Sequence, residues 1–271
     1  MSDSTGLGDR MKRYETATRA VLPPRTYTVL RVDIRSGHSY LRGADRPFDE
    51  QFMRHMDTVA EALCAEVSGA VLAYTQSDEI SVLYTDFGSE HTQPWFGGVL
   101  AKQVSIAAAC ATAALNAARP GKRVMFDARV FTLPNAVEVA NYLIWRQRDA
   151  VRNSISMAAQ ARIPHKQLHG VNAKQMQELL WSRHGINWTD YPDGAKRGRL
   201  TDRHTGEREV TWTHKRTGET HTETAAHSWW ETAAAPHFTT EPNGFLAEAI
   251  PEAPRFDPSA PAQNTTTEVR Q

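Results

Sequence analysis

Two adjacent carboxylates, Asp78 and Glu79, lie between two short apolar runs at residues 70–74 and 80–84. The runs are rich in Val, Leu, Ile and Tyr and have the length of strands, so they predict a β-hairpin with both carboxylates at its tip. Such a pair is a candidate site. Because Ser and Asp are common turn formers, the tip also has the composition of a solvated turn, which this stretch alone favours.

A third carboxylate, Asp33, ends an alternating, β-rich segment at residues 26–34. An Asp at the end of an apolar strand costs desolvation free energy unless it is paired or bound to a metal ion. Capping of a turn explains Asp33 equally well from this segment alone. The meaning of these carboxylates therefore depends on the elements that position them.

The order of the predicted elements brings two of the carboxylates together. A strand, a helix, the hairpin, a second helix, a strand and a third helix follow one another, as in split βαβ, or ferredoxin-like, folds. The two inner strands of that plan lie side by side, so Asp33 and Asp78 should meet at one edge of the sheet. The expected ranges are 26–34, 49–69, 70–84, 95–118, 123–133 and 136–161.

A carboxylate pair from adjacent strands, without cations of its own, favours a divalent metal ion. Oxygen ligands and retained water suit Mg²⁺. Two-metal phosphoryl or nucleotidyl transfer is the reaction class that such a pair serves. The residues therefore predict an α+β fold with a metal site at Asp33 and Asp78.

Two of the predicted helices carry further signals. The helix at 95–118 is apolar nearly all round, so we expect it to be well buried. Its single cation, Lys102, is more typical of a snorkelling side chain than of a phosphate ligand. The helix at 136–161 carries a dense polar cluster at residues 145–154.

The C-terminal third begins with a helix at 174–185 and a loop at 185–199, where aromatic residues stand beside Lys196, Arg197 and Arg199. Aromatic residues combined with basic ones can bind nucleic acid, and a solvated loop explains the composition equally well.

The chain divides into three predicted parts. Residues 1–165 form the catalytic core, and 166–250 form an extension with the basic loop and two exposed hairpins, at 203–209 and 215–222. Residues 251–271, rich in Pro, Ala and Thr, are predicted to be a disordered tail.

The composition excludes several classes of protein. The formal net charge is zero, so nucleic-acid binding by bulk charge is not indicated and would need a local basic patch. The two cysteines, Cys64 and Cys110, stand in apolar helical patterns and are predicted to be buried thiols. No membrane span and no signal peptide are expected, so we predict a cytoplasmic protein.

Several motifs in a fixed order make the sequence similar to one family, the tRNA-His guanylyltransferases. The resemblance is closer to the bacterial and archaeal guanylyltransferase-like branch, whose members are 3′-to-5′ polymerases. It covers residues 9–199, with weaker similarity at 236–251. The motifs are RVDIRSGH (31–38), YTQSDE (74–79), FDARV (126–130), WRQRD with RNSISM (145–149 and 152–157), and GINW with KRG (185–188 and 196–198).

The resemblance implies a polymerase-palm-like catalytic core on the split βαβ plan, with C-terminal helical and β-hairpin additions. It implies two Mg²⁺ ions held by Asp33, the backbone carbonyl of Ile34, and Asp78. Glu79 falls on the family's neighbouring essential carboxylate. Asp33, Asp78 and Glu79 are therefore the expected catalytic residues.

Other positions match residues through which the family contacts its substrates. The residues expected to bind nucleotide are Arg35, Ser36, Gly37, His38, Arg46, Ser77 and Lys102. The residues expected to contact RNA are Arg129, Arg152, Asn153, Lys196 and Arg197.

The resemblance also implies the substrates and the reaction. The 5′-monophosphate of a tRNA is activated with ATP or GTP, with loss of pyrophosphate. The 3′-hydroxyl of an incoming nucleotide then attacks the activated end, which adds one residue in the 3′-to-5′ direction. The implied partners are tRNA and nucleoside triphosphates, and a homotetramer is expected because members of the family are tetramers.

Three departures from the family pattern bear on function. Ile34 replaces the usual Gly, which a backbone carbonyl ligand tolerates if φ stays negative. Val99 stands where a basic triphosphate-contacting residue is common. Residues 151–154 lack the His of eukaryotic members, and RNSISM resembles the guanylyltransferase-like branch. Template-dependent repair of tRNA 5′ ends and G addition to tRNA-His both stay open.

Two other functions also stay open. Nucleotide cyclases with palm domains use paired carboxylates at strand ends, although the polar cluster and the basic loop favour a polynucleotide substrate. An inert RNA-binding module that has kept only the fold is the other alternative, and the presence of both Asp33 and Asp78 counts against it.

Overall fold

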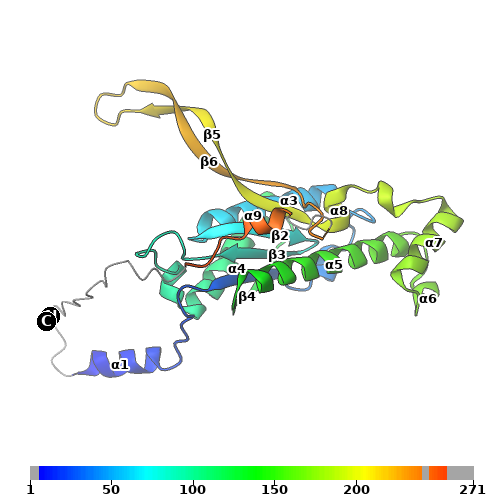
Figure 1. Ribbon diagram of the computed structural model, residues 1–271, viewed down its shortest axis with the longest axis horizontal. Helices are drawn as coiled ribbons and strands as arrows, with labels where there is room; N and C mark the ends of the chain where they lie inside the picture. The colour runs from blue at the N-terminus through cyan, green and yellow to red at the C-terminus, as the bar shows by residue number, and fades with distance from the viewer. Residues whose placement is uncertain (1–5, 240–243, 255–271) are drawn as a thin grey trace.

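A six-stranded antiparallel sheet forms the centre of the computed structural model, which describes residues 6–239 and 244–254 (Figure 1). The strand order is β4-β1-β3-β2-β5-β6, so β1 lies between β3 and β4. The strands are β1 (Tyr27–Ile34), β2 (Ala70–Gln76), β3 (Glu79–Tyr84), β4 (Phe126–Leu133), β5 (Arg199–Thr213) and β6 (Thr220–Ala234).

Three long helices cover the two faces of the sheet. Helices α3 (Glu50–Glu66) and α4 (Leu100–Ala118) share a core with Leu30 and Val32 of β1. Helix α5 (Ala136–Gln160) packs on the opposite face, against a core that includes Val29. Because successive residues of a strand point to opposite faces, β1 is apolar on both sides. The arrangement confirms the predicted α+β, palm-like β-α-β-β-α-β plan.

Most of the remaining helices are short and lie around this core, whereas α1 stands apart from it and has no buried residue (Figure 1). Helix α2 follows β1 directly, and α6 to α8 connect α5 to β5. Their bounds are α1 (Leu7–Thr16), α2 (Gly37–Tyr40), α6 (His165–Leu168), α7 (Ala173–His184), α8 (Asp193–Arg197) and α9 (Phe245–Ala249), with 3₁₀ turns η1 (Trp95–Gly98) and η2 (Trp188–Asp190). No helix among the residues that the structure describes is long and apolar enough to cross a membrane.

Helix α4 is less buried than its composition predicts. Its buried residues, Gln103, Ala107, Ala111 and Leu115, form one stripe with a spacing of four, while Ile106 is 38% exposed. Only the stripe faces the sheet and α3, so the expectation of a well-buried helix holds for one face alone. Composition gives the apolar character of a helix but not the number of its covered faces. Of the two cysteines, which are both free, Cys64 is buried and Cys110 half-buried.

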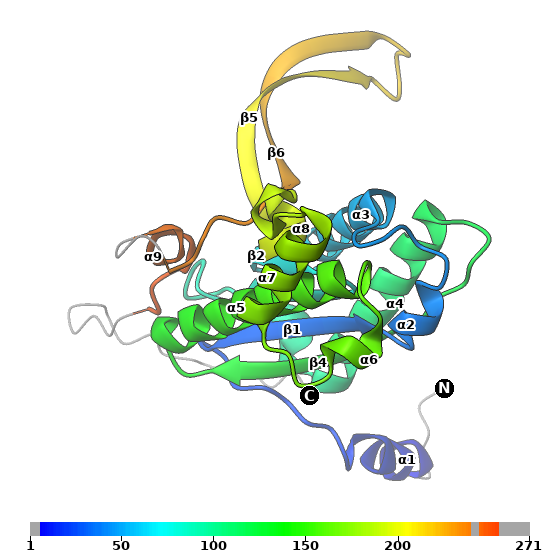
Figure 2. The ribbon, with the colours of Figure 1, turned by 90° about the vertical axis from the view of Figure 1, so that its right-hand side faces the viewer.

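Strands β5 and β6 form one long hairpin, so the prediction of two hairpins was wrong. They pair without interruption from Arg199 opposite Ala234 to Thr213 opposite Thr220. The first residues of β5 also pair with β2, and beyond them the hairpin projects away from the core (Figure 2). Residues 205–207 lie within β5 and form no turn. A Cβ on Gly206 would come within 3.2 Å of the Trp229 ring.

The hairpin joins the core at Gly198, where a side chain cannot be accommodated. Gly198 has φ +83, and a Cβ would lie 2.5 Å from the hydroxyl oxygen of buried Tyr74 and 2.8 Å from the carbonyl oxygen of Thr75. The close approach lets the Tyr74 hydroxyl donate to the carbonyl of Arg197 at 2.6 Å. Position 198 therefore requires glycine for both its backbone conformation and its contacts.

Gly198→Ala should lower the free energy of unfolding by more than the ~1–2 kcal/mol that a left-handed Ala costs by itself. Urea denaturation measures the change. Gly218→Ala is the matched control because Gly218 also has positive φ, +74, but nothing lies within 4 Å of its Cβ position. Equal losses in the two variants would contradict the steric role of Gly198.

The predicted disordered tail at 251–271 falls outside the described residues from position 255 onward. The segment between α9 and that point runs from Ile250 to Pro254 and contacts the core. There, the carbonyl of Pro251 accepts a hydrogen bond from the Tyr27 hydroxyl at 2.7 Å.

Candidate active site

The carboxylates of the two predicted motifs meet at the end of β1. Asp33 is paired with Glu79 of β3 on one side and with Asp127 of β4 on the other. The amide of Ile34 donates to the carbonyl of Asp78 at 3.2 Å, which ties β1 to the turn between β2 and β3. Only Ser77 and Asp78 form that turn, with Ser77 at φ +48. The structure thus brings Asp33 and Asp78 together.

Asp78 lies directly against the start of α2. A Cβ on Gly37 would lie 1.8 Å from Oδ2 of Asp78. Among the described residues, Asp78 makes no ion pair. Asp33 is half-exposed. Its only ion pair among the residues that the structure describes is a 3.5 Å contact with Arg31. The pair therefore retains negative charge that nearby cations do not neutralise.

This excess charge appears in the titration of Asp33. Burial raises the pKa of the Asp33 carboxyl, and the neighbouring charge of Asp78 raises it further, while Arg31 opposes the shift. A bound cation would relieve the repulsion between the two carboxylates and favour their ionised forms.

Glu79, although adjacent to Asp78, lies in a different environment. As the first residue of β3 it points to the face covered by α5 and is only 6% exposed. Its carboxylate is paired with Arg146, with Nε 3.0 Å from Oε1 and Nη2 donating to Oε2 at 3.1 Å, and also with Arg31. Burial raises the pKa of Glu79 to about 7, against the opposing effect of the two arginines. Its contacts make Glu79 a support of the site.

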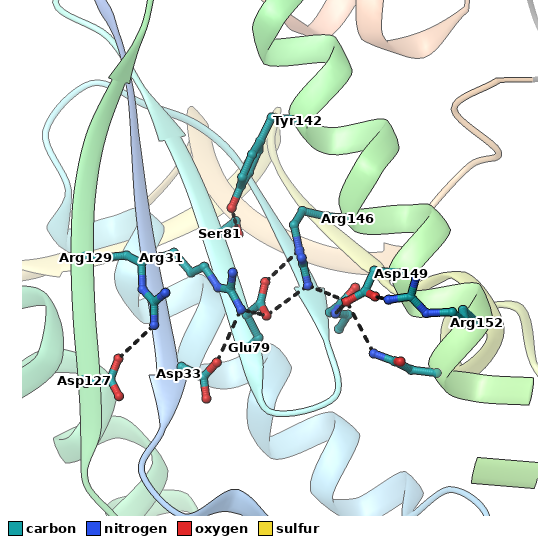
Figure 3. Close-up of polar contacts among 12 residues, drawn as sticks. Arg31, Asp33, Glu79, Ser81, Asp127, Arg129, Tyr142, Arg146, Asp149 and Arg152 are labelled. Carbon is teal, nitrogen blue, oxygen red and sulfur yellow. Dashed lines mark hydrogen bonds and ion pairs between the residues drawn. The ribbon is translucent and has the colours of Figure 1, made fainter. Parts of the chain in front are cut away.

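A row of three polar contacts attaches α5 to the β2–β3 hairpin (Figure 3). The Tyr142 hydroxyl lies 2.8 Å from that of Ser81, and Arg146 pairs with Glu79. Asp149 accepts from the Gln76 amide at 3.3 Å, just before the turn. Residues 142, 146 and 149 lie on one side of the helix because their spacing is four and three.

Asp149 extends the row to the surface of α5. It is paired with Arg146 at 2.8 Å and with Arg152, and Asn153 donates to it at 3.4 Å. Charges of alternating sign thus run from Asp33 through Arg31, Glu79, Arg146 and Asp149 to Arg152 (Figure 3).

A cavity of about 400 Å³ lies beside the carboxylates. Four of the residues expected to contact nucleotide or RNA line it, and so does Gln76. These four are His38, Arg46, Ser77 and Asn153. The segment after β1, the β2–β3 turn and α5 therefore supply walls of one cavity, although they are far apart in the chain.

The structure does not bring all the predicted nucleotide-binding residues to this cavity. Arg35 and Ser36 are exposed in the turn that leads from β1 to Gly37. Lys102 is exposed in the first turn of α4, whereas the other end of that helix approaches β4, where Asn116 bonds to Val124. Lys102 thus lies at the end of α4 remote from Asp33.

The predicted RNA-contacting cations are mostly paired with carboxylates. Arg129 is exposed and lies 3.6 Å from Asp127. Lys196 is 7% exposed, lies 3.0 Å from Asp193 and also approaches the Trp188 ring. Arg197 lies 2.7 Å from the same carboxylate.

Arg199, the third cation of the basic loop, is paired with Asp57 of α3. The cations of this loop, for which nucleic-acid binding and a solvated loop were equally open, are therefore largely neutralised within the chain. The carboxylates of Asp193 and Asp57 hold α8 and the start of β5 in place.

Three residues of the site were missed as individual functional residues, namely Arg31, Arg146 and Asp149. The sequence carries a signal for Arg146, which falls in the buried stripe of Val139, Leu143 and Ala150. A charged residue in the buried stripe of a helix requires a partner of opposite charge. The sequence does not identify the partner, Glu79, because only the packing of α5 on the sheet brings the two residues together.

The donor set fits Mg²⁺. No cluster of three or more His, Cys, Asp or Glu side chains able to hold a metal ion occurs in the described ranges. The side chains thus offer the two carboxylates of Asp33 and Asp78, and backbone carbonyl, water and substrate oxygens would complete the coordination. Mg²⁺ in nucleotide-processing sites is bound in this way, whereas Zn²⁺ takes nitrogen and sulfur ligands.

The palm-like sheet and the carboxylate pair at its central strands are typical of nucleotide-processing enzymes, nucleotidyltransferases among them. The family model described as tRNAHis guanylyltransferase matches residues 8–134. A solved bacterial tRNA(His) guanylyltransferase-like protein in complex with ATP is 39% identical, with a TM-score of 0.75, over 88% of this chain and 96% of that one. The chain belongs to the tRNA(His) guanylyltransferase family.

Two further relatives agree with this assignment. A bacterial tRNA(His) guanylyltransferase-like protein in complex with GTP is 36% identical, with a TM-score of 0.69, over 86% of this chain and 94% of that one. The tRNA(His) guanylyltransferase of Schizosaccharomyces pombe is 28% identical over 70% of this chain and 77% of its own length.

Proposed function

We propose that this protein is a Mg²⁺-dependent nucleotidyltransferase that adds nucleotides to the 5′ end of tRNA in the 3′-to-5′ direction. The observation that carries the proposal is the position of Asp33 and Asp78 at the end of β1, beside the cavity lined by His38, Arg46 and Ser77. Membership of the family and the ATP and GTP complexes of its bacterial relatives support tRNA and nucleoside triphosphates as substrates.

The proposed reaction has two displacements at phosphorus. The 5′-phosphate of the tRNA attacks the α-phosphate of ATP or GTP and releases pyrophosphate, which leaves an activated 5′ end. The 3′-hydroxyl of the incoming nucleotide then attacks the 5′-phosphate of the tRNA, with release of the activating nucleoside monophosphate. The site must therefore accommodate two negative charges, one on the deprotonated hydroxyl and one on the transferring phosphoryl group.

The side chains have separable roles in this scheme. Asp33, Asp78 and the carbonyl of Ile34 would hold two Mg²⁺ ions, which supply Lewis acidity to hydroxyl and phosphate oxygens. Ser77 and His38 offer hydrogen bonds to a nucleotide in the cavity, and Arg46 offers a cation to its phosphates. Glu79, enclosed by arginines, supports the turn that carries Asp78.

The RNA contacts and the assembly are also proposals. Arg152 and Asn153 lie on α5, and Asn153 is the one predicted RNA-contacting residue among those that line the cavity. Lys196 and Arg197 would contact RNA only if their pairing with Asp193 changed. We expect a homotetramer, which light scattering measures directly.

Incubation of a 5′-truncated tRNA with nucleoside triphosphates and Mg²⁺ tests the function. The wild-type protein should extend the tRNA, Asp78→Ala should not, and the half-exposed control Asp202→Ala, which lies on β5 remote from the carboxylate pair, should behave as wild type. Absence of extension by the wild type, or unchanged extension by Asp78→Ala, would refute the proposal. Cyclic nucleotide formed without RNA would favour a cyclase instead.

The template position separates the two forms of the activity. Template-dependent repair adds U opposite A and G opposite C, whereas dedicated G addition to tRNA-His adds G in both cases. We propose template-dependent repair, because residues 151–154 lack the His of the eukaryotic members.

A further inference from the structure

Arg146 is the buried cation between the carboxylate site and α5. It is 3% exposed and contacts carboxylates on two sides, Glu79 at the start of β3 and Asp149 one turn further along α5. It does not line the cavity. A fully buried guanidinium between two carboxylates must act through the groups that it holds.

Each of these two carboxylates adjoins residues that line the cavity. Glu79 directly follows the Ser77–Asp78 turn, so its position sets where that turn joins β3. Asp149 accepts from the amides of Gln76 at 3.3 Å and Asn153 at 3.4 Å, and both of these residues line the cavity. One guanidinium thus connects the turn that carries Asp78 with the α5 wall.

The geometry requires Arg rather than any other cation. A guanidinium presents several N–H donors in a fixed plane, which allows it to contact two carboxylates at defined angles. In Arg146, Nε faces Glu79 while Nη2 reaches both Glu79 and Asp149. A Lys at this position would keep the charge but offer a single nitrogen, so it could not fix both carboxylates in the same orientation.

We propose that Arg146 is a positioning residue of the reaction. It holds the β2–β3 turn against α5 and thereby sets Asp78 relative to the nucleotide-binding cavity. The role of the cavity rests on the proposed function, whereas the position of the turn can be measured independently of any activity.

Arg146→Lys separates positioning from charge balance, because it leaves neither Glu79 nor Asp149 as an unpaired buried charge. We expect the variant to fold, as measured by circular dichroism and thermal unfolding. Its kcat for tRNA extension should fall by about 10²-fold, the scale for a misplacement of about 1 Å in a catalytic group. Amide hydrogen exchange at residues 76–79 should become faster.

Arg148→Lys is the matched control. It lies two residues along the same helix and is exposed, and its side chain makes no ion pair or hydrogen bond within the described part of the chain. Its kcat, its exchange at residues 76–79 and its affinity for ATP should equal those of the wild type.

Arg146→Gln completes the test. If Arg146 acts only through its charge, Arg146→Lys should keep the turnover and the slow exchange of the wild type. Arg146→Gln, which removes the charge, should then lower stability and change nothing else. That result would overturn the proposal, as would unchanged exchange at residues 76–79 in Arg146→Lys. If the wild type itself does not extend tRNA, the proposed function fails, while the exchange measurement still decides whether Arg146 holds the turn.

Discussion

Asp33→Asn and Asp78→Asn should each lower the rate of tRNA extension by about 10³-fold or more, the scale for losing a group that stabilises charge in a transition state. Each substitution preserves shape but removes one of the two carboxylates available to Mg²⁺. The loss should appear in kcat, measured at saturating nucleotide, because the charge is needed most while the phosphoryl group transfers.

Asp33→Asn should not destabilise the fold. Burial and the charge of Asp78 raise the pKa of Asp33, so its ionised form is less favourable in the folded protein than in the unfolded chain. The penalty is absent at low pH and develops as pH rises through the folded pKa. At neutral pH, Asp33→Asn removes it, and the melting temperature without metal should stay equal or rise.

Addition of Mg²⁺ provides the metal-specific measurement. A ligand that binds the folded state alone raises the melting temperature, so Mg²⁺ with nucleotide should stabilise the wild type more than Asp33→Asn or Asp78→Asn. Asp202→Ala should respond as the wild type. An equal response in all four proteins would show that these carboxylates do not bind the metal.

Gly37→Ala should reduce turnover by about 10²-fold without unfolding the protein. A Cβ at this position would lie 1.8 Å from Oδ2 of Asp78, so either the carboxylate or the start of α2 must move. The backbone of Gly37 does not require glycine for its conformation, since its φ is not positive. The effect is therefore purely steric and falls on the Asp78 carboxylate.

Ser39→Ala is the control for this prediction, because Ser39 is exposed in the same short helix. Extension assays and thermal unfolding of both variants give the comparison. The steric argument fails if Gly37→Ala keeps wild-type kcat. Combining Gly37→Ala with Asp78→Asn should cost little beyond Asp78→Asn alone, because the two residues act on the same group.

The convergence of Asp33 and Asp78 followed from local patterns. The alternating strand, the hairpin and the helices between them are each readable from periodicity, and the order of the elements then fixes which strands are neighbours. The orientation of Glu79 was not readable in this way. It depends on the turn having only two residues, since one residue more or fewer would turn Glu79 to the other face.

The basic loop shows a different limit. Lys196 and Arg197 follow Asp193 by three and four residues, a spacing at which the side chains meet on a helix. Without α8 recognised as a helix, the same residues give the composition of an exposed patch. The pairing of Arg199 with Asp57 was beyond prediction, because only tertiary packing brings α3 and β5 together.

The central place of β1 has a consequence for how the protein folds. Asp33 is held between β3 and β4, and β4 comes much later in the chain than β1. Pairings between distant segments form late because loop closure must precede them. The long β5–β6 hairpin, in contrast, pairs residues close in sequence. Synthesis must therefore pass Leu133 before Asp33 has both neighbours, and it must pass Thr201 before β2 has its partner in β5, so the carboxylate site is complete before the far side of the sheet.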